Sequence, residues 1–281
     1  MLLPHSRLRV LLSFCGLATL TLATFASAES AANETPAAAE SCCAVIELRQ
    51  YTLYPYKRDV LIDLFEREFV ESQEAVGINI VGQFRDIDNQ NRYVWVRGFH
   101  DMDTRAKALQ AFYYGPVWQA HRNAANATIV DSDNVLLLRP ANSRSEFPAP
   151  KSARPPIGAT EPGSALVTAT IYARNVPIDD EFVHFFETQV KPLLTQTGAS
   201  PLAYFETETA ANNFPKLPVR SGENIFVWFA IFANQAAYDE HRRRLAQSKP
   251  WNEKVLPDLS KRLKSPPQQL RLEPAPRSLL R

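Results

Sequence analysis

The sequence predicts an α+β fold built from two tandem copies of one βαββαβ unit, and the first observation behind this prediction is an internal duplication. The four tryptophans form two pairs, Trp95 with Trp118 and Trp228 with Trp251, and the second pair follows the first by 133 residues. Four further matches occur at a displacement of 121 residues: Tyr51 with Tyr172, Phe65 with Phe186, Gly77 with Gly198 and Phe84 with Phe205. The displacement changes where a polar segment, 209–224, replaces the short turn 86–91.

The second observation is the periodicity of apolar residues within the first copy. Alternating apolar and polar residues predict strands at 45–53, 78–86, 92–99 and 134–140. Apolar residues at helical spacing predict a helix over 59–77 that ends at Gly77. A second helix is expected over 103–112, and it continues or restarts over 116–128 after the Gly115–Pro116 step.

The second copy repeats this order of elements. Strands are expected at 165–174, 201–208, 224–232 and 269–274, and helical segments at 180–198 and 235–263. The order strand, helix, strand, strand, helix, strand is that of the ferredoxin-like fold. We therefore predict two tandem ferredoxin-like domains, 44–140 and 165–275, joined by a Pro- and Ser-rich linker at 141–164.

The first 28 residues have the parts of a secretory signal peptide. Arg7 and Arg9 precede an apolar stretch, and small residues lead up to Ala28. We expect cleavage after Ala28, a flexible leader over 29–43, and a periplasmic or secreted protein. No later segment has the roughly 18 consecutive apolar residues of a membrane span. We therefore expect no membrane contact after cleavage.

The acidic and basic residues are almost balanced, with 31 Lys and Arg against 30 Asp and Glu. This balance argues against a nucleic-acid partner, which would require a basic face. Cys42 and Cys43 are adjacent, which leaves open two free thiols or a bridge to another chain. No Cys or His set with metal-ligand spacing accompanies them, so we expect neither a bound metal nor a cofactor.

Three strings in the first copy resemble one known family. IELRQYTL, YVWVRGF and YYGPVWQAHRNAAN, the last followed by NVLLLRP, resemble the NIPSNAP family of the dimeric α/β-barrel group. The resemblance covers about 45–140, and the second copy has KPWNEKVLPDL in place of the Gly-Pro-x-Trp string. It implies two four-stranded sheets that enclose a cavity, within one chain or across a homodimer. It implies no reaction, because the wider group contains cofactor-free monooxygenases, haem enzymes and isomerases.

Strand alternation predicts which side chains face this cavity. We expect the apolar face of each strand to meet the helices and the more polar face to line the barrel. In the first copy the predicted lining is Glu47, Arg49, Tyr51, Gln83, Arg85, Tyr93, Trp95 and Arg97. In the second copy it is Thr168, Thr170, Tyr172, Tyr204, Glu206, Phe226 and Trp228.

Two interpretations of the charged lining stay open, because charges on a covered sheet face are costly unless they are paired or hydrated. Glu47 and the arginines could form ion pairs across the two sheets. Alternatively, they could bind a small anionic or polar aromatic molecule, with arginine as a carboxylate-binding fork and aromatic rings as walls. The candidate ligand-binding residues are Glu47, Arg49, Tyr51, Arg85, Tyr93, Trp95, Arg97, Tyr114, Tyr172 and Tyr204.

His121 is the weak candidate for catalysis. It follows Trp118 by three residues on the expected helix, so it could act as a general base at the mouth of the cavity. A lone helical histidine is more often a packed or rim residue. The sequence thus predicts an exported NIPSNAP-domain protein that binds a small molecule, with or without cofactor-independent catalysis. The alternative is a non-catalytic interaction module with a filled barrel.

Overall fold

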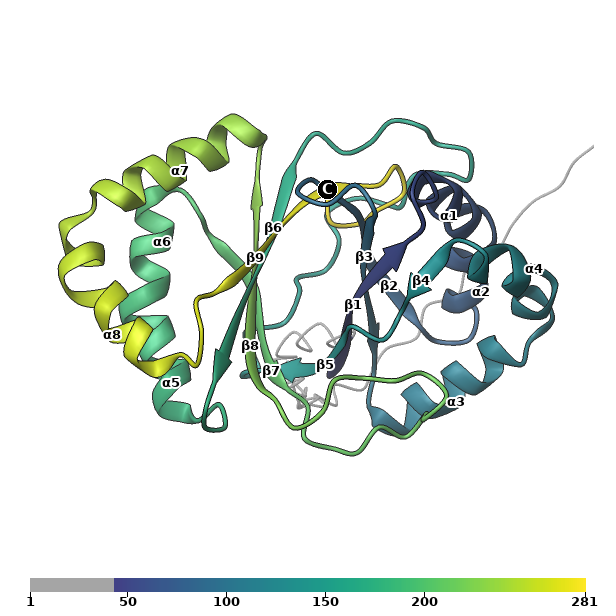
Figure 1. Cartoon of the computed structure of the whole chain (residues 1–281), viewed down its shortest axis with the longest axis horizontal. Helices are drawn as coiled ribbons and strands as arrows, with labels where there is room; N and C mark the ends of the chain where they lie inside the picture. Colours follow the sequence, from purple (N-terminus) through teal and green to yellow (C-terminus); the bar gives the residue numbers. More distant parts are fainter. Residues whose placement is uncertain (1–42) are drawn as a thin grey trace, which may run out of the picture. The chain divides into compact units, whose positions relative to one another are not determined.

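The computed structural model describes residues 43–281, which belong to one compact unit (Figure 1). The predicted signal peptide and residues 29–42 of the predicted leader lie outside the described residues. Cys43 is disulfide-bonded, so the alternative of two free thiols is wrong. None of the described helices is long and apolar enough to cross a membrane.

The first half of the chain contains five strands and two helical segments, and both segments are divided. In chain order these elements are β1 (Val45–Leu53), α1 (Arg58–Leu64), the π-helix η1 (Phe65–Phe69), α2 (Val70–Glu74), β2 (Asn79–Asp86), β3 (Arg92–Phe99), α3 (Met102–Tyr113), α4 (Pro116–Asn126), β4 (Ile129–Asp131) and β5 (Val135–Pro140). The sequence did not predict the short strand β4, which pairs with the end of β1.

The second half repeats the order without an equivalent of β4. Its elements are β6 (Leu166–Arg174), α5 (Asp180–Phe185), the π-helix η2 (Phe186–Val190), α6 (Lys191–Thr197), β7 (Pro201–Thr207), β8 (Asn224–Phe232), α7 (Gln235–Gln247), the π-helix η3 (Trp251–Val255), α8 (Leu256–Arg262) and β9 (Gln268–Pro274). The helical segment expected over 235–263 is therefore interrupted, and α7 ends before Pro250.

Eight of the strands close into one antiparallel barrel within a single chain. The order around the barrel is β3-β2-β9-β6-β8-β7-β5-β1, and β1 pairs with β3 to complete the circle. The two halves meet at two seams, where β2 pairs with β9 and β5 pairs with β7. Helices α1–α4 and α5–α8 lie on opposite sides of the strands (Figure 1). The molecule is thus a mixed α/β fold with a closed antiparallel barrel.

The interior of the barrel is filled with apolar side chains. One buried cluster draws alternate residues from all eight barrel strands, including Ile46, Leu48, Val94, Val96, Leu136, Leu138, Val167, Ile171, Phe205, Val227, Phe229 and Leu272. An eight-stranded barrel is just wide enough for such side chains to fill it. The prediction of a polar cavity inside the barrel is therefore wrong.

The faces of the strands are the reverse of those predicted. Tyr51, Tyr93 and Trp95 pack with residues of α1, η1 and α3 in a second cluster, and Tyr172, Tyr204, Phe226 and Trp228 pack with α5, η2 and α6 in a third. The prediction assumed that the apolar face would meet the helices. In a closed barrel both faces are covered, so the most apolar set fills the interior and the mixed set lies under the helices.

A bulge in β2 makes one local exception to this reversal. The pairing of β2 with β3 shifts between Ile80 and Gly82. Ile80 consequently packs on the helix side, as predicted, while Phe84 packs inside the barrel. A bulge inserts one residue into a strand and so changes the face that the following side chains occupy.

Gly115 allows α3 and α4 to meet at a tight junction. A Cβ atom at this position would lie 2.6 Å from the carbonyl oxygen of Ala111. We expect Gly115→Ala to lower the free energy of unfolding by about 1–3 kcal/mol, because the backbone must shift to relieve this overlap. Urea denaturation measures the loss. Ala120→Ser, at an exposed site of α4, should change it by less than about 0.5 kcal/mol. A loss no larger than that of this control would contradict the prediction.

Candidate functional site

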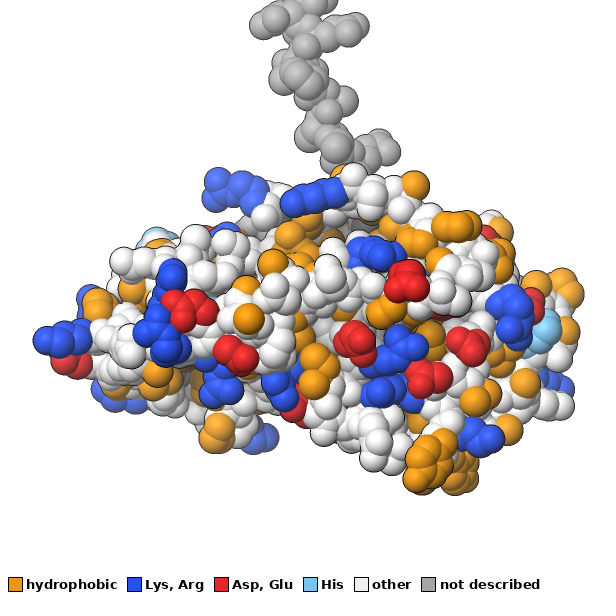
Figure 2. All heavy atoms as spheres, turned by 90° about the horizontal axis from the view of Figure 1, so that it is seen from above, with side chains coloured by type: hydrophobic (Ala, Val, Ile, Leu, Met, Phe, Trp, Pro, Cys, Tyr) orange, Lys and Arg blue, Asp and Glu red, His pale blue; other side chains and the backbone are white. Residues whose placement is uncertain are grey.

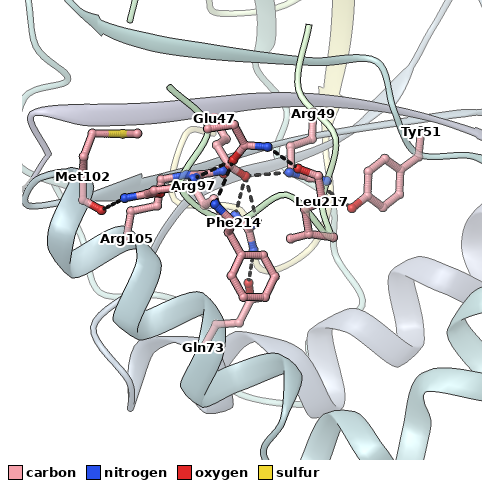
Figure 3. A network of polar contacts seen from close by, with 11 residues as sticks. Glu47, Arg49, Tyr51, Gln73, Arg97, Met102, Arg105, Phe214 and Leu217 are labelled. Atoms are coloured by element: carbon pink, nitrogen blue, oxygen red, sulfur yellow. Dashed lines mark hydrogen bonds and ion pairs between the residues drawn. The ribbon is translucent and has the colours of Figure 1, made fainter. Parts of the chain in front are cut away.

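Four fully buried charged side chains meet under the helices of the first half. Glu47 accepts from Arg49 Nη1 at 2.6 Å, from Arg97 Nε at 2.8 Å and from Arg105 Nε at 2.7 Å. Each of the four has an exposed fraction of 0%. Glu47, Arg49 and Arg97 extend from the strands, while Arg105 reaches them from α3 (Figure 3). The predicted ion pairing of Glu47 is thus present, but it joins sheet to helix rather than sheet to sheet.

This cluster contains more positive than negative charge. Three guanidinium groups share one carboxylate, and no other ion pair joins these arginines within residues 43–281. Burial alone would raise the pKa of Glu47, but Arg97, Arg49 and Arg105 together hold it far below its ordinary value. Glu47 therefore stays ionised, and the cluster keeps a surplus of two positive charges. Buried charge without a partner is costly, so the surplus favours an anion at this place.

Amide oxygens and aromatic rings accept part of the surplus. Gln73 Oε1 accepts from Arg97 Nη1 at 3.1 Å, and Asn213 Oδ1 accepts from Arg105 Nη1 at 2.7 Å. The guanidinium carbon of Arg97 lies 5.0 Å from the centre of the Trp95 ring, within the range of a cation–π contact. These groups are neutral, so they reduce the cost of the buried charge without cancelling it.

Two buried donors beside this cluster have neither a hydrogen-bond partner nor an ion-pair partner among the described residues. They are Nη2 of Arg49 and Nε1 of Trp95. Tyr51 is adjacent, and its hydroxyl accepts from Arg49 Nε at 3.0 Å. Burial raises the pKa of Tyr51 although Arg49 opposes this shift, so the phenol keeps its proton. Arg49, Trp95 and Tyr51 thus offer three donors to an incoming anion.

A small hollow lies next to these donors, between the sheet and the helices. Its volume is about 90 Å³, and its walls are largely aromatic: Tyr51, Phe65, Phe69, Trp95, Phe112, Tyr113 and Trp118. The other lining residues are Leu61, Gln73, Ala125, Asn126, Ile129, Ser132 and Leu217. Arg49 lies directly behind two of the wall rings, with its guanidinium carbon 5.3 Å from the Tyr51 ring centre and 5.5 Å from that of Trp95.

A larger open cleft of about 670 Å³ borders the segment that joins β7 to β8. Its charged lining is internally paired, since Arg139 binds Glu206 at 2.7 Å and Arg220 binds Glu223. These pairs leave no surplus positive charge, and Glu208, which also lines the cleft, is acidic and would repel an anion. The lining also lacks an unpartnered buried donor comparable to those near the hollow. We therefore place the candidate site at the smaller hollow.

The π-helix η1 supplies two walls of the hollow, Phe65 and Phe69. Its counterpart η2 begins at Phe186, which follows Phe65 by 121 residues, the displacement noted in the sequence. A π-helix therefore occurs at the same place in the half that lacks the charged cluster. We assign η1 to the shared scaffold, because a feature specific to the site would not recur there.

Several predicted site residues lie elsewhere in the first half. Arg85 pairs with Asp59 of α1 at 2.7 Å near the surface. The hydroxyl of Tyr93 donates to Gln83 Oε1 at 3.1 Å within the core. Tyr114 is exposed and contacts Lys216, while its neighbour Tyr113 lines the hollow.

His121 lies outside the lining of the hollow. Its Nε2 atom is 3.5 Å from a carboxylate oxygen of Glu68, and about a third of the side chain is exposed. Its ring touches Phe69 from the outer side, with ring centres 6.3 Å apart. The structure therefore gives no contact through which His121 would act on a molecule in the hollow.

The second half has no equivalent of the charged cluster. Thr168 and Thr170 follow Glu47 and Arg49 by 121 residues, and Ala230 follows Arg97 by 133 residues. Tyr172 stacks with Phe226 at a centre distance of 6.3 Å, and the hydroxyl of Tyr204 donates to Glu187. Trp228 packs in the same core, and Glu206 pairs with Arg139 at the seam between β5 and β7. The predicted site residues of this half therefore belong to its core and to the seam.

Arg105 and Gln73 were missed by the sequence-based prediction. Arg105 shares a helical stripe with the buried residues Ala108, Leu109 and Phe112. An arginine inside an apolar stripe is unusual unless it has a buried partner, and this pattern could have identified it. Gln73 shows no comparable signal, because its neighbours in sequence are polar.

Charge is distributed differently on the surface. On the face shown in Figure 2, basic and acidic side chains alternate without forming a broad patch of one sign. No group of three or more His, Cys, Asp or Glu side chains in residues 43–281 is arranged to hold a metal ion. The buried cluster is therefore the charge feature that sets the first half apart.

Comparison with known families identifies this half. Residues 46–144 match the NIPSNAP family model. The first half is a NIPSNAP domain. The match includes β1, β2, β3 and β5 and all of the helices that cover the hollow, so the charged cluster lies within the NIPSNAP domain. No curated protein matches the chain.

Solved structures resemble either the whole described chain or the NIPSNAP domain alone. A proposed monooxygenase from Fusobacterium nucleatum is 10% identical, covers 82% of this chain and 92% of its own, and has a TM-score of 0.53. An uncharacterized NIPSNAP domain protein from Burkholderia xenovorans is 18% identical, over 35% of this chain and 96% of its own, with a TM-score of 0.33. A NIPSNAP family protein from Agrobacterium tumefaciens is 21% identical, over 35% and 94%, with a TM-score of 0.33. At 10% identity, the similarity to the Fusobacterium nucleatum protein shows only that the fold is shared.

Proposed function

We propose that the NIPSNAP domain binds a small aromatic carboxylate in the hollow between its sheet and its helices. The surplus positive charge of the buried cluster beside an aromatic-walled hollow is the observation that supports this most directly. A carboxylate would receive a hydrogen bond from Tyr51, and the Arg49 guanidinium behind the Tyr51 and Trp95 rings would attract its charge and bond to it once these rings move apart. Its ring would pack against Phe65 and Trp95. Charge-assisted hydrogen bonds to a buried guanidinium are among the strongest that a protein forms.

The volume limits the size of this ligand. At about 90 Å³ the hollow is well below the roughly 300 Å³ at which pockets for drug-sized molecules begin. A molecule with a single ring is therefore the largest that we expect here, and the walls must move outward to admit it, since a cavity of about 150 Å³ holds benzene. We take benzoate as the probe for this class of ligand.

We propose binding rather than catalysis, because Glu47 and Tyr51 are not suited to proton transfer near neutral pH. The pKa of Glu47 is held far below neutrality by three arginines, and burial raises that of Tyr51. A general acid or base works best with a pKa near the working pH. We do not assign to this chain the monooxygenase activity proposed for the Fusobacterium nucleatum protein.

Calorimetric titration of the purified protein in low-chloride buffer tests the proposal. We expect benzoate to bind at least about tenfold more tightly than benzyl alcohol, which has the ring without the charge and would forgo about 1.4 kcal/mol or more. Equal affinities for the two would contradict a charge-driven site. If sodium chloride stabilises the protein as much as benzoate does, an inorganic ion is sufficient and the aromatic part of the proposal is wrong.

A second candidate function is that of a non-catalytic interaction module, and the filled barrel interior favours it. The paired halves would then present a docking surface. Pull-down from a periplasmic extract with the full chain should recover a specific partner if this candidate is correct. Benzoate binding without any recovered partner would favour the small-molecule site.

We further propose that the chain is an exported tandem duplication of a ferredoxin-like domain that acts as a monomer. The constant displacements of tryptophan and glycine, and the matching positions of η1 and η2, support the duplication. The disulfide of Cys43 supports export, since disulfides persist mainly in oxidising compartments. Closure of the barrel within one chain supports the monomer, because each half already covers the other.

A further inference from the structure

The loop between β7 and β8, residues 208–223, extends from the second half onto the NIPSNAP domain. Leu217 of this loop lines the hollow. The ring of Phe214 stacks on Tyr113 with centres 5.9 Å apart. The backbone N–H of Arg220 donates to the carbonyl oxygen of Val135 at 2.9 Å. One wall of the site in the first half is therefore supplied by the second half.

The same loop also touches the charged cluster, through Asn212. The side-chain oxygen of Asn212 accepts from Arg105 Nη1 at 3.1 Å and from the backbone N–H of Phe214 at 3.1 Å. Its amide nitrogen donates to the carbonyl oxygen of Leu217 at 2.9 Å. Asn212 thus connects the arginine cluster to the residue that closes the hollow. Figure 3 shows Leu217 and Phe214 lying over the network of Glu47 and its arginines.

A charged cluster in the second half does not account for the length of this loop. That half has threonines and an alanine where the first half has its charged cluster, and its core is closed by its own aromatic residues. The equivalent connection in the first half, between β2 and β3, spans only residues 87–91. The additional residues of the β7–β8 loop are the ones that reach the hollow.

We infer that the β7–β8 loop determines the size of the ligand that the NIPSNAP domain accepts. Leu217 is the size-determining residue, and Asn212 is the residue that positions it. This inference rests on the proposed function, because it concerns the same hollow. Removal of the Leu217 side chain would lengthen the hollow toward the loop and admit a second ring.

The test measures dissociation constants for benzoate and 1-naphthoate with the full chain, by calorimetry. In the wild type we expect benzoate to bind more tightly than 1-naphthoate. Leu217→Ala should shift the ratio of the two affinities toward 1-naphthoate by about tenfold or more, the effect expected when a wall of a hydrophobic pocket is removed. Asn212→Ala should shift the ratio in the same direction by a smaller factor. Val219→Ala, on the same loop but outside the lining of the hollow, is the matched control and should leave the ratio within about twofold.

The ratio of the two affinities separates a role in specificity from a general loss of stability, because destabilisation weakens the binding of both acids by the same factor. Benzoate binding with an unchanged ratio in Leu217→Ala would overturn this inference and leave the proposed function standing. An equal shift in Val219→Ala would also overturn it. Failure of the wild type to bind either acid would overturn the proposed function, and this inference with it.

Discussion

Replacing Glu47 by Gln will lower the free energy of unfolding by about 3–5 kcal/mol, as is typical when one member of a buried ionic network is removed. Glutamine has nearly the shape of glutamate, so packing is preserved and the loss is electrostatic. Three buried guanidinium groups would then share no carboxylate. Urea denaturation at pH 7 measures the change.

Asp59→Asn is the matched control for this prediction. Asp59 also pairs with an arginine, Arg85, but its side chain is 66% exposed. Pairs of this kind contribute about 0–1 kcal/mol. If Glu47→Gln costs no more than Asp59→Asn, the cluster is hydrated or otherwise neutralised, and the surplus charge at the candidate site does not exist.

The contribution of Glu47 will also depend on pH in the acid range. Its pKa is lowered in the folded protein from an ordinary value of 4.5, because Arg97, Arg49 and Arg105 outweigh the opposing effect of burial. The stabilisation is therefore fully present above pH 4.5 and is lost progressively as the pH falls toward the folded-state pKa. The gap between wild type and Glu47→Gln should narrow below pH 4.5, and a gap that stays constant from pH 7 to strongly acid solution would refute this.

Replacing Arg49 by Met should change the affinity for benzoate more than it changes the stability of the protein. It removes one of the surplus cations, so we expect the unfolding free energy of the free protein to rise or to change by less than about 1 kcal/mol. Benzoate affinity should fall by about a hundredfold, because a charge-assisted hydrogen bond and its attraction are lost. Denaturation and calorimetry on the same preparation measure both quantities.

Arg85→Met provides the comparison, since Arg85 lies on the helix side of β2 and pairs with Asp59 outside the hollow. This variant should retain benzoate binding. If Arg49→Met is as damaging to folding as Glu47→Gln, the four charges act as a balanced structural unit. If instead benzoate binds Arg49→Met normally, the carboxylate is held by other groups.

The sequence predicted most strands and helices closely, because the pattern of apolar residues begins and ends where each element does. The strands at 45–53, 92–99 and 224–232 were predicted to the residue, since alternation begins and ends there with polar turns. The short strand β4 was missed because three residues carry no recognisable period. The break after α7 was missed because its helical pattern continues past Pro250.

The faces of the strands could not be predicted from alternation alone. Alternation places Glu47 and Arg49 on one face of the strand and Ile46 and Leu48 on the other. It does not show which of these two faces packs against the helices. That choice depends on partners far away in the sequence, such as Arg105 on α3. Of the residues predicted in the first half, Tyr51 and Trp95 lie at the hollow, and Glu47, Arg49 and Arg97 form the charged cluster beside it. All five lie under the helices rather than inside the barrel, where they were predicted. The role of 209–224 could not be foreseen, because a polar loop in one half gives no sign that it covers the other.

The position of β9 has a consequence for how the chain folds. This strand pairs with β6 on one side and with β2 on the other, and it consists of residues 268–274. Until β9 has been synthesised, β2 and β6 each have an open edge. The unpaired N–H and C=O groups of such an edge are prone to pair with other chains. The contact between β2 and β9 also joins residues nearly two hundred positions apart, and such distant pairings form slowly. The barrel can therefore close only after residues 268–274 have been synthesised, and its two halves depend on protection from aggregation until then.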